Sequence, residues 1–234
     1  MSHHSVSRHL RIAIDRYDAA IRQFIRGYEE MLDAAVDAVL EAGVPARVVD
    51  LGSGTGALAE RLLERCESCV VELWDVDPAM LGQARERLAR FGQRAVPRER
   101  SFEQPLEGVD VAMASLALHH VRDLGEKTVL YRALASGLGA GGLLVNADVT
   151  IPADPAAGAA EYRAWADHQV ASGIAEEEAW AHFEEWAEED RYFSLEEELG
   201  ALAEAGFEPE CTWRLAPSTV IAARIANSQG VGVG

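Results

Sequence analysis

The chain has 234 residues, 49% of them hydrophobic, and a formal net charge of −18 at pH 7, which suits one domain with a buried core. The negative charge argues against nucleic acid as a partner, because no basic stretch is set apart from the acidic surface. No apolar run approaches the roughly 20 residues of a membrane span, and three cysteines are too few for a disulfide framework, so we expect a cytoplasmic protein that makes no membrane contact.

The N-terminal part of the chain has a helical pattern. Apolar residues recur three or four positions apart from Ile12 to Leu40, which predicts helix with a break near Gly27. The stretch "EAGVPA" then ends the pattern with glycine and proline. We interpret residues 11–42 as an N-terminal helical cap on a domain that occupies the whole chain, residues 1–234.

Short apolar strands alternate with amphipathic helices over residues 46–150, which is typical of a parallel sheet covered by helices. Strands are predicted at 46–51, 69–76, 94–99, 108–118 and 142–150, and helices at 57–66, 78–91 and 123–138. Pro97 marks its strand as an edge or a kinked strand. With two closing strands at 207–215 and 218–225, the predicted class is α/β: a Rossmann-like, doubly wound, mostly parallel sheet of seven strands.

The alternation stops at "IPADPAAGAA", and residues 153–193 are predicted to form a helical insertion, with one or two acidic helices from Glu161 to Asp190. Residues 194–225 then supply a last helix, which Ser194 and Glu197 begin as a capping box, and the closing strands. Aromatic residues at helical spacing in the insertion are typical of a core. They could equally form a lid that walls off a planar substrate, or an apolar stripe that pairs with a second copy in a homodimer. The candidate substrate contacts are Trp165, His168, Trp180 and Trp186.

The segment "VVDLGSGTGALAERL", Val48 to Leu62, joins a strand, a glycine-rich turn and a helix. Free backbone N–H groups at such a helix start bind a small molecule at the carboxyl ends of the strands. The pattern of Gly52, Gly54 and Ala57 fits the loose dinucleotide fingerprint, with Asp75 or Asp77 as the ribose-binding acid, so an NAD(P)-dependent oxidoreductase stays open. Against it, the carboxylate of Asp50 would repel a diphosphate and attract an ammonium group.

Four motifs, in order, resemble those of the class I S-adenosylmethionine-dependent methyltransferases: "VVDLGSGTG", "LWDVDPAML", "DVAMASLALHHVRD" and "LGAGGLLVNAD". Outside this core, "FIRGYEEMLDAAV" and the insertion are similar to the carboxy-S-adenosylmethionine tRNA uridine transferases and their small-molecule-methylating relatives. The resemblance implies S-adenosylmethionine as the cofactor and S-adenosylhomocysteine as the product. It also implies a small molecule, rather than tRNA, as the acceptor.

The resemblance also implies roles for single residues. At the amino-acid end of the cofactor, Asp50 would meet the ammonium group and Tyr28 the carboxylate, while Ser115 would close the pocket beneath the sulfonium. The backbone that passes under the methionine moiety would be that of Gly52, Ser53 and Gly54. At the nucleoside end, Asp75 would bind the ribose hydroxyls, and the residues near the adenine would be Val76, Met80, Ser101 and Phe102.

Methyl transfer needs alignment of the acceptor and, for a hydroxyl or ammonium acceptor, a base. His119 and His120 follow the fourth strand; we favour His120 as the base, although packing at a helix start would also explain them. Asp148, at the end of the fifth strand, is a candidate to orient the substrate. Cys66 and Cys69 lack the further ligands of a metal site, so no metal is expected.

The predicted function is therefore methylation of a small acceptor, of an aromatic or heterocyclic natural-product type. A non-catalytic protein that binds S-adenosylmethionine is a further alternative.

Overall fold

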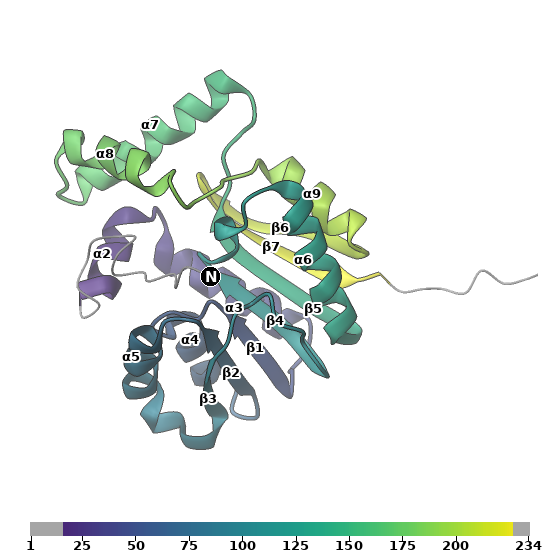
Figure 1. The fold of residues 1–234 in the computed structure, drawn as a ribbon. Helices are drawn as coiled ribbons and strands as arrows, with labels where there is room; N and C mark the ends of the chain where they lie inside the picture. Colours follow the sequence, from purple (N-terminus) through teal and green to yellow (C-terminus); the bar gives the residue numbers. More distant parts are fainter. Residues whose placement is uncertain (1–15, 227–234) are drawn as a thin grey trace, which may run out of the picture.

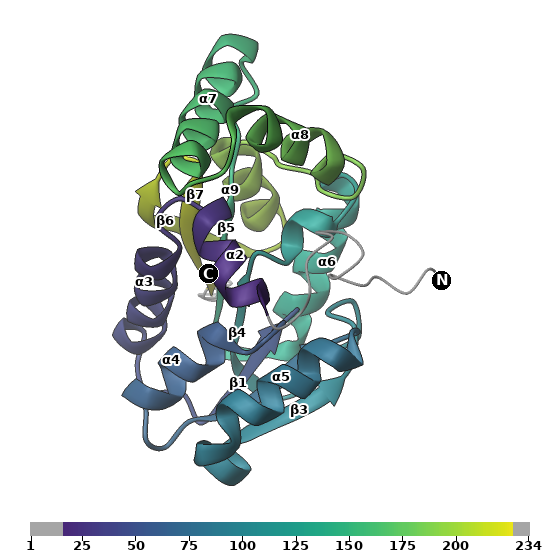
Figure 2. The same ribbon diagram turned by 90° about the vertical axis from the view of Figure 1, so that its left-hand side faces the viewer.

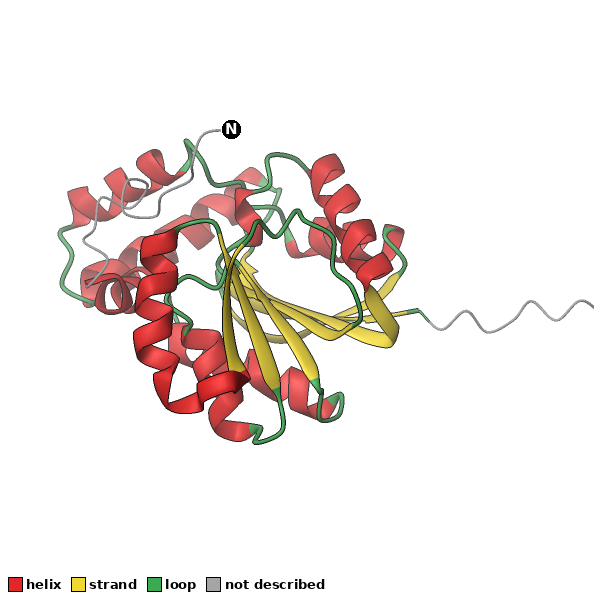
Figure 3. Cartoon of the chain, turned by 60° about the horizontal axis from the view of Figure 1, so that its bottom comes forward, coloured by secondary structure: helices red, strands yellow, loops and turns green. Residues whose placement is uncertain are grey.

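The structure is a computed structural model and describes residues 16–226. Its strands form one twisted sheet flanked by helices (Figure 3). The seven strands lie in the order β3-β2-β1-β4-β5-β7-β6, in which β7 runs antiparallel to both β5 and β6 and the other pairs are parallel. The strands are β1 Arg47–Leu51, β2 Val70–Asp75, β3 Ala95–Glu99, β4 Val109–Ser115, β5 Leu138–Val149, β6 Phe207–Leu215 and β7 Ser218–Ile225. The predicted class, a mostly parallel Rossmann-like sheet, is confirmed.

Helices cover both faces of this sheet (Figure 1). The α-helices are α2 Tyr17–Phe24, α3 Tyr28–Glu41, α4 Ala57–Arg65, α5 Pro78–Leu88, α6 Leu124–Gly137, α7 Pro155–Ala171, α8 Glu176–Trp186 and α9 Leu195–Glu204. Two 3-10 helices, η2 Ala89–Arg94 and η3 Leu118–His120, complete the described elements. The predicted break at Gly27 separates α2 from α3, and the predicted capping box of Ser194 and Glu197 begins α9. Residues 11–15 of the predicted cap lie outside the described residues.

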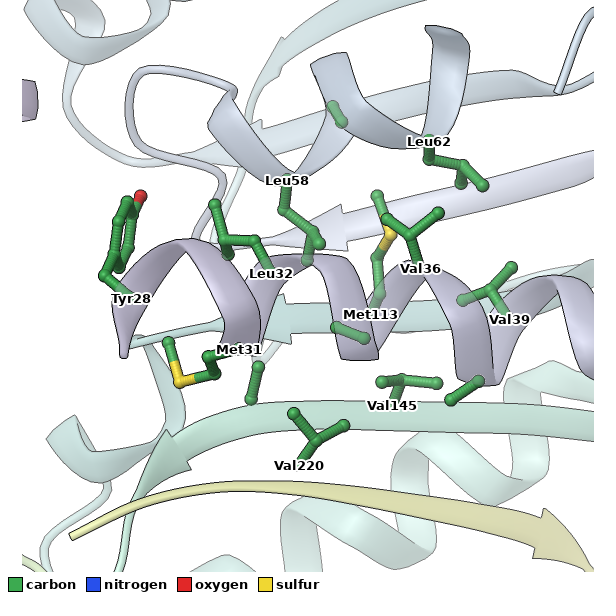
Figure 4. Close-up of a cluster of buried hydrophobic side chains, with 14 of the residues drawn as sticks. Tyr28, Met31, Leu32, Val36, Val39, Leu58, Leu62, Met113, Val145 and Val220 are labelled. Carbon is green, nitrogen blue, oxygen red and sulfur yellow. The ribbon is translucent and has the colours of Figure 1, made fainter. Parts of the chain in front are cut away.

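Strand side chains alternate between two cores. Val111 and Met113 of β4 face α3, α4 and α5, whereas Ala112 and Ala114 face α6 and α9. The central element of the first core is α3, whose apolar side chains recur on one face and reach β4, β5 and β7 (Figure 4). Since Asp50 and Ser115 follow the same alternation as Val48 and Met113, both point toward the α3 and α4 side at the carboxyl end of the sheet.

Two predicted boundaries are wrong. The fifth strand begins at Leu138 rather than Gly142, because Leu138 already pairs with Val109 of β4. The glycines that follow form an irregularity in β5, since the register with β4 shifts between Val109 and Val111. The first helix of the insertion begins at Pro155 rather than Glu161, because the carboxylate of Asp154 caps it by accepting from the backbone N–H groups of Ala156 and Ala157. Pro97 does lie on an edge strand, β3.

The three cysteines are too few for a framework of several disulfides, but two of them form one disulfide. Cys66 and Cys69 form a disulfide that closes the link between α4 and β2, and Cys211 is the free thiol. Between residues 16 and 226, no helix is both long enough and apolar enough to cross a bilayer.

The insertion, α7 and α8, lies beyond the carboxyl ends of the strands and packs on α2 (Figure 2). The indole Nε1 of Trp165 donates to the backbone oxygen of Phe24 at 2.6 Å, and the side-chain amide of Gln23 donates to the backbone oxygen of Ser172 at 3.1 Å. These bonds place the insertion and the N-terminal cap together, above the glycine loop.

Candidate functional site

A pocket opens where β1 and β4 end, beneath α2 and the start of α3. We call it the Asp50 pocket, and its lining residues are Tyr17, Tyr28, Asp50, Ser53, Gly54, Thr55, Ala57, Leu58, Ser115 and Leu116. The structure therefore brings together five of the residues predicted to hold the amino-acid end of the cofactor: Tyr28, Asp50, Ser53, Gly54 and Ser115.

The glycines of the loop serve two different purposes. Gly52 has a φ of +64°, and a Cβ added there would lie 2.6 Å from Cβ of Ala117, so packing between the loops after β1 and β4 excludes a side chain. Gly54 also has a positive φ, +52°, but a Cβ there would meet nothing within 4 Å. Its backbone faces the open pocket, where a ligand can approach closely.

Asp50 is the most unusual side chain of the pocket. It is 1% exposed, and its Oδ2 atom has no hydrogen-bond partner among the described residues. Burial, with a further contribution from the nearby Asp75, raises the pKa of Asp50 to about 8. A backbone hydrogen bond from Ala59 opposes this rise. A buried carboxylate oxygen without a partner is costly, and a ligand ammonium group would relieve that cost. The site thus fits the amino-acid end of S-adenosylmethionine and disfavours a diphosphate.

Asp75 ends β2 and holds the glycine loop. Its Oδ2 accepts from the backbone N–H of Gly54 at 2.7 Å, and its Oδ1 accepts from that of Asp77 at 2.8 Å. Burial raises the pKa of Asp75, while these two hydrogen bonds oppose the rise. Asp77 instead caps α5 by accepting from the backbone N–H of Ala79 at 2.9 Å. The second oxygen of Asp77, Oδ2, is buried and has no hydrogen-bond partner among the described residues. The role of Asp75 as the ribose ligand therefore stays a prediction.

The predicted adenine contacts lie on both sides of the loop. Val76 is 39% exposed, an unusual value for a large apolar side chain at a strand end, whereas Met80 is fully buried and lies under the surface. Ser101 accepts from the backbone N–H of Glu103 at 3.1 Å, and Phe102 lies against Gly52. Their roles toward adenine stay predictions.

Sequence reasoning missed Tyr17, Thr55, Leu58 and Leu116, which together with Ala57 complete the pocket. Thr55 donates to Oδ1 of Asp18 at 2.7 Å and accepts from Arg87 at 3.1 Å, which joins the loop to α2 and α5. Burial raises the pKa of Tyr17 and, together with the charge of Asp18, that of Tyr28 to about 12, so both phenols are hydroxyl donors at neutral pH. The sequence could have indicated Tyr17, because this residue carries a hydroxyl group at a position that belongs to the apolar face of the predicted N-terminal helix.

Leu116 has a left-handed backbone, with a φ of +51°, which is uncommon for a branched residue. Its backbone N–H donates to the oxygen of Ala147 at 2.9 Å, so β5 holds it in place. A strained residue at a pocket wall is a feature of functional sites.

The candidate catalytic residues form a cluster beside this wall. Nδ1 of His119 lies 2.7 Å from Oδ1 of Asp148, and the backbone N–H of His119 donates to Oδ2 of the same carboxylate at 3.1 Å. Asp190, from the segment after α8, adds an oxygen 3.1 Å from Nδ1 of His120 and 3.7 Å from Nε2 of His119. Sequence reasoning missed Asp190, because no spacing connects it to the two histidines.

Charge and burial compete in this cluster. Burial lowers the pKa of His119, but the carboxylates of Asp148 and Asp190 outweigh it, so the pKa of His119 is raised. For Asp148, burial acts to raise the pKa, and the contact with His119 reverses the direction, so its pKa is lowered.

The aromatic residues of the insertion lie mostly inside it. Trp165 and Trp186 are buried and pack on each other and on Phe183. Trp180 is half-buried beneath the guanidinium of Arg163, and His168 is half-buried as well. None of the four predicted substrate contacts lines the Asp50 pocket. Their contact with a substrate stays a prediction.

Comparisons with known proteins agree with this geometry. Residues 49–144 match a family model described as a methyltransferase domain. A trans-aconitate 2-methyltransferase from Mycobacterium ulcerans (strain Agy99) is 40% identical over 75 residues, covering 32% of this chain and 27% of the relative. Another, from Mycobacterium sp. (strain KMS), is 33% identical over 140 residues, which cover 60% of this chain and 48% of the relative. The chain thus spans about half or less of the length of these relatives.

An O-methyltransferase family protein from Burkholderia thailandensis has a similar solved structure. It matches with a TM-score of 0.71 over 98% of this chain and 65% of its own length, at 18% sequence identity. At that identity the match shows a shared fold.

Proposed function

We propose that this chain, whose residues 49–144 match a methyltransferase-domain family model, transfers a methyl group from S-adenosylmethionine to a small-molecule acceptor. The observation that carries the proposal is the buried Oδ2 atom of Asp50, which lies in a pocket beside the open backbone of Gly54. That arrangement suits an ammonium group and no phosphate.

The cofactor would supply a methyl group made electrophilic by its sulfonium, and the chain would supply binding and alignment. Asp50 pairs with the ammonium group and the Tyr28 hydroxyl donates to the carboxylate. Asp75 accepts from the ribose hydroxyls with the oxygen lone pairs that its two backbone bonds leave. Val76 covers the adenine with Ser101 and Phe102, while buried Met80 supports them, and Ser115 closes the wall below the sulfur.

Toward the acceptor we keep His120, His119 and Asp148 as the catalytic set. The ring of His120 is the more accessible of the two imidazoles, with 19% of its side chain exposed against 9% for His119. The His120 ring therefore takes the proton of the acceptor in this proposal. Asp148 orients the neighbouring ring, that of His119. From the insertion, the half-buried Trp180 and His168 contact the acceptor, and Trp165 and Trp186 support them from the lid core.

An aromatic or heterocyclic natural product is the proposed acceptor class. An oxygen acceptor is supported by the description of the Burkholderia protein as an O-methyltransferase family member. S-adenosylhomocysteine as product, a cytoplasmic location and a homodimer through the insertion belong to the same proposal. Light scattering at micromolar concentration tests the homodimer; a mass of one chain throughout contradicts it.

The alternatives have less support. A dinucleotide oxidoreductase would place a diphosphate beside the carboxylate of Asp50, and the matched family model is a methyltransferase domain. A non-catalytic binding protein would use the same pocket, so only turnover separates it from an enzyme.

The test is incubation of the protein with methyl-labelled S-adenosylmethionine and a panel of hydroxylated aromatic, heterocyclic and carboxylic acids. We expect label in at least one acceptor. The Asp50→Asn variant should lose this transfer, and the control variant Asp37→Asn should keep it, because Asp37 is an exposed carboxylate paired with Arg65. Binding of S-adenosylhomocysteine without transfer to any acceptor would instead support the non-catalytic alternative.

A further inference from the structure

Four side chains from distant parts of the chain meet at the edge of the insertion, residues 153–193, which we call the lid. They are His119 and His120 of η3, Asp148 of β5 and Asp190 of the segment after α8. Asp148 and Asp190 each keep only 4% of their side chain exposed. Three elements therefore converge on one buried set of imidazoles and carboxylates.

The cluster is rich in negative charge. Two buried carboxylates face two imidazoles, which are neutral or singly charged. Lys127, the only lysine of the chain, is already paired with Glu198. Protonation of the imidazoles, or a bound cation, balances the charge of the two buried carboxylates.

The candidate ligand atoms lie close to one another. One ligand atom from each of His119, His120 and Asp190 can be chosen so that all three lie within 4.8 Å of one another. Nε2 of His119 lies 3.7 Å, and Nδ1 of His120 3.1 Å, from Oδ1 of Asp190. Bonds of about 2.0–2.2 Å to a tetrahedral ion would hold such atoms about 3.4 Å apart, so small side-chain shifts suffice.

Outer hydrogen bonds fix two of these ligands. Nδ1 of His119 contacts Asp148 at 2.7 Å, which leaves Nε2 facing Asp190. The hydroxyl of Tyr192 donates to Oδ2 of Asp190 at 2.6 Å, which leaves Oδ1 facing the histidines. A carboxylate behind a metal-binding imidazole is the usual outer partner of a zinc ligand.

We propose that His119, His120 and Asp190 bind one divalent transition-metal ion, with Asp148 as the outer partner of His119. Two imidazoles and one carboxylate suit Zn²⁺ or Fe²⁺ and leave a coordination position for water or for an oxygen of a small molecule. Because Asp190 belongs to the lid segment and the histidines to the core, the ion also ties the lid to the core.

The metal site does not depend on methyl transfer, since it is measured without cofactor or acceptor. If both hold, His120 is a metal ligand and not the base; the bound cation would stabilise the negative oxygen of the acceptor after its proton has passed to water.

The experiment starts from protein stripped of metal with EDTA. Visible absorption monitors a titration with Co²⁺. Calorimetry measures titrations with Zn²⁺ and, in the absence of oxygen, with Fe²⁺. We expect one ion per chain with a Kd of micromolar or below, and the intense absorption of Co²⁺ held by few ligands. Asp190→Asn and His120→Ala should weaken binding at least 100-fold, and Asp148→Asn about 10- to 100-fold.

Two controls exclude binding elsewhere. His182→Ala changes a histidine of the lid outside the cluster and should leave binding unchanged, as should replacement of His3, His4 and His9 together by alanine. Circular dichroism checks that Asp190→Asn, which keeps the side-chain shape, is folded. Absence of one-to-one binding in the unsubstituted protein, binding kept in folded Asp190→Asn, or binding lost in the N-terminal histidine variant each overturns the proposal.

Discussion

Asp50 is the side chain on which cofactor recognition depends, and its ionisation gives a prediction. Burial and the neighbouring Asp75 raise the pKa of Asp50 to about 8, and only the ionised carboxylate attracts an ammonium group. Affinity for S-adenosylhomocysteine should therefore fall as pH drops below about 8, by up to tenfold per pH unit. Calorimetry between pH 6 and 9 measures this; Asp50→Asn should bind weakly with no such slope. A flat profile in the unsubstituted protein would contradict the role.

The same pKa predicts that Asp50 destabilises the ligand-free fold. Between the unfolded pKa of 3.8 and the folded pKa of about 8, the folded chain keeps a proton that the unfolded chain has lost. The free energy of unfolding should thus decrease by about 1.4 kcal/mol per pH unit through this window. Asp50→Asn should melt at a higher temperature than the unsubstituted protein at pH 8 and at a similar one near pH 4. Equal melting temperatures at pH 8 would count against burial as the cause.

The site residues that could be predicted are those that belong to a single sequence motif. Asp50 and Asp75 lie at the carboxyl ends of their strands and Gly54 follows the first of these strands, so their place at one sheet edge could be foreseen. Tyr17 and Asp190 could not, because α2 and the lid segment reach the site only by packing. The expectation of no metal rested on Cys66 and Cys69 alone, and adjacent histidines with a distant aspartate give no recognisable spacing.

Among the elements, α6 and α9 carry a buried ion pair whose strength can be measured. Lys127 of α6 pairs with Glu198 of α9, and the hydroxyl of Tyr131 donates to the same carboxylate at 2.6 Å. Glu198→Ala leaves Lys127 buried without its partner, which should cost about 3–5 kcal/mol of unfolding free energy.

The same two helices supply the control. Arg132 and Glu204 pair at 2.6 Å with 51% and 66% of their side chains exposed. Because exposed pairs contribute little, Glu204→Ala should cost less than about 1 kcal/mol. Urea unfolding compares the two variants, and equal losses would show that burial does not set the difference.

Elements with local signals were foreseen, and those set by long-range pairing were not. The capping box of Ser194 and Glu197 and the edge strand with Pro97 needed only their own residues. The start of β5 at Leu138 depends on pairing with Val109 of β4, a long-range contact, and the glycines then form an irregularity inside the strand. In the lid, burial of Trp165 depends on α2, which lies far away in the sequence.

For the whole molecule, the mostly parallel seven-stranded sheet and its covering helices followed from the alternation of strands and helices and from the motif resemblance, whereas the order of the strands was not predicted. The net charge of −18 adds a prediction about partners. Because an acidic surface repels phosphates, tRNA should not bind measurably at physiological ionic strength. A filter-binding assay over a salt series tests this, and micromolar binding that weakens steeply with salt would restore RNA as a substrate.

The most direct test of the central claim is a crystal structure of the complex with S-adenosylhomocysteine. The account predicts the ligand's amino nitrogen within about 3 Å of Oδ2 of Asp50, and its ribose hydroxyls on Asp75. A ligand bound elsewhere, or one whose amino group lies away from Asp50, would contradict it.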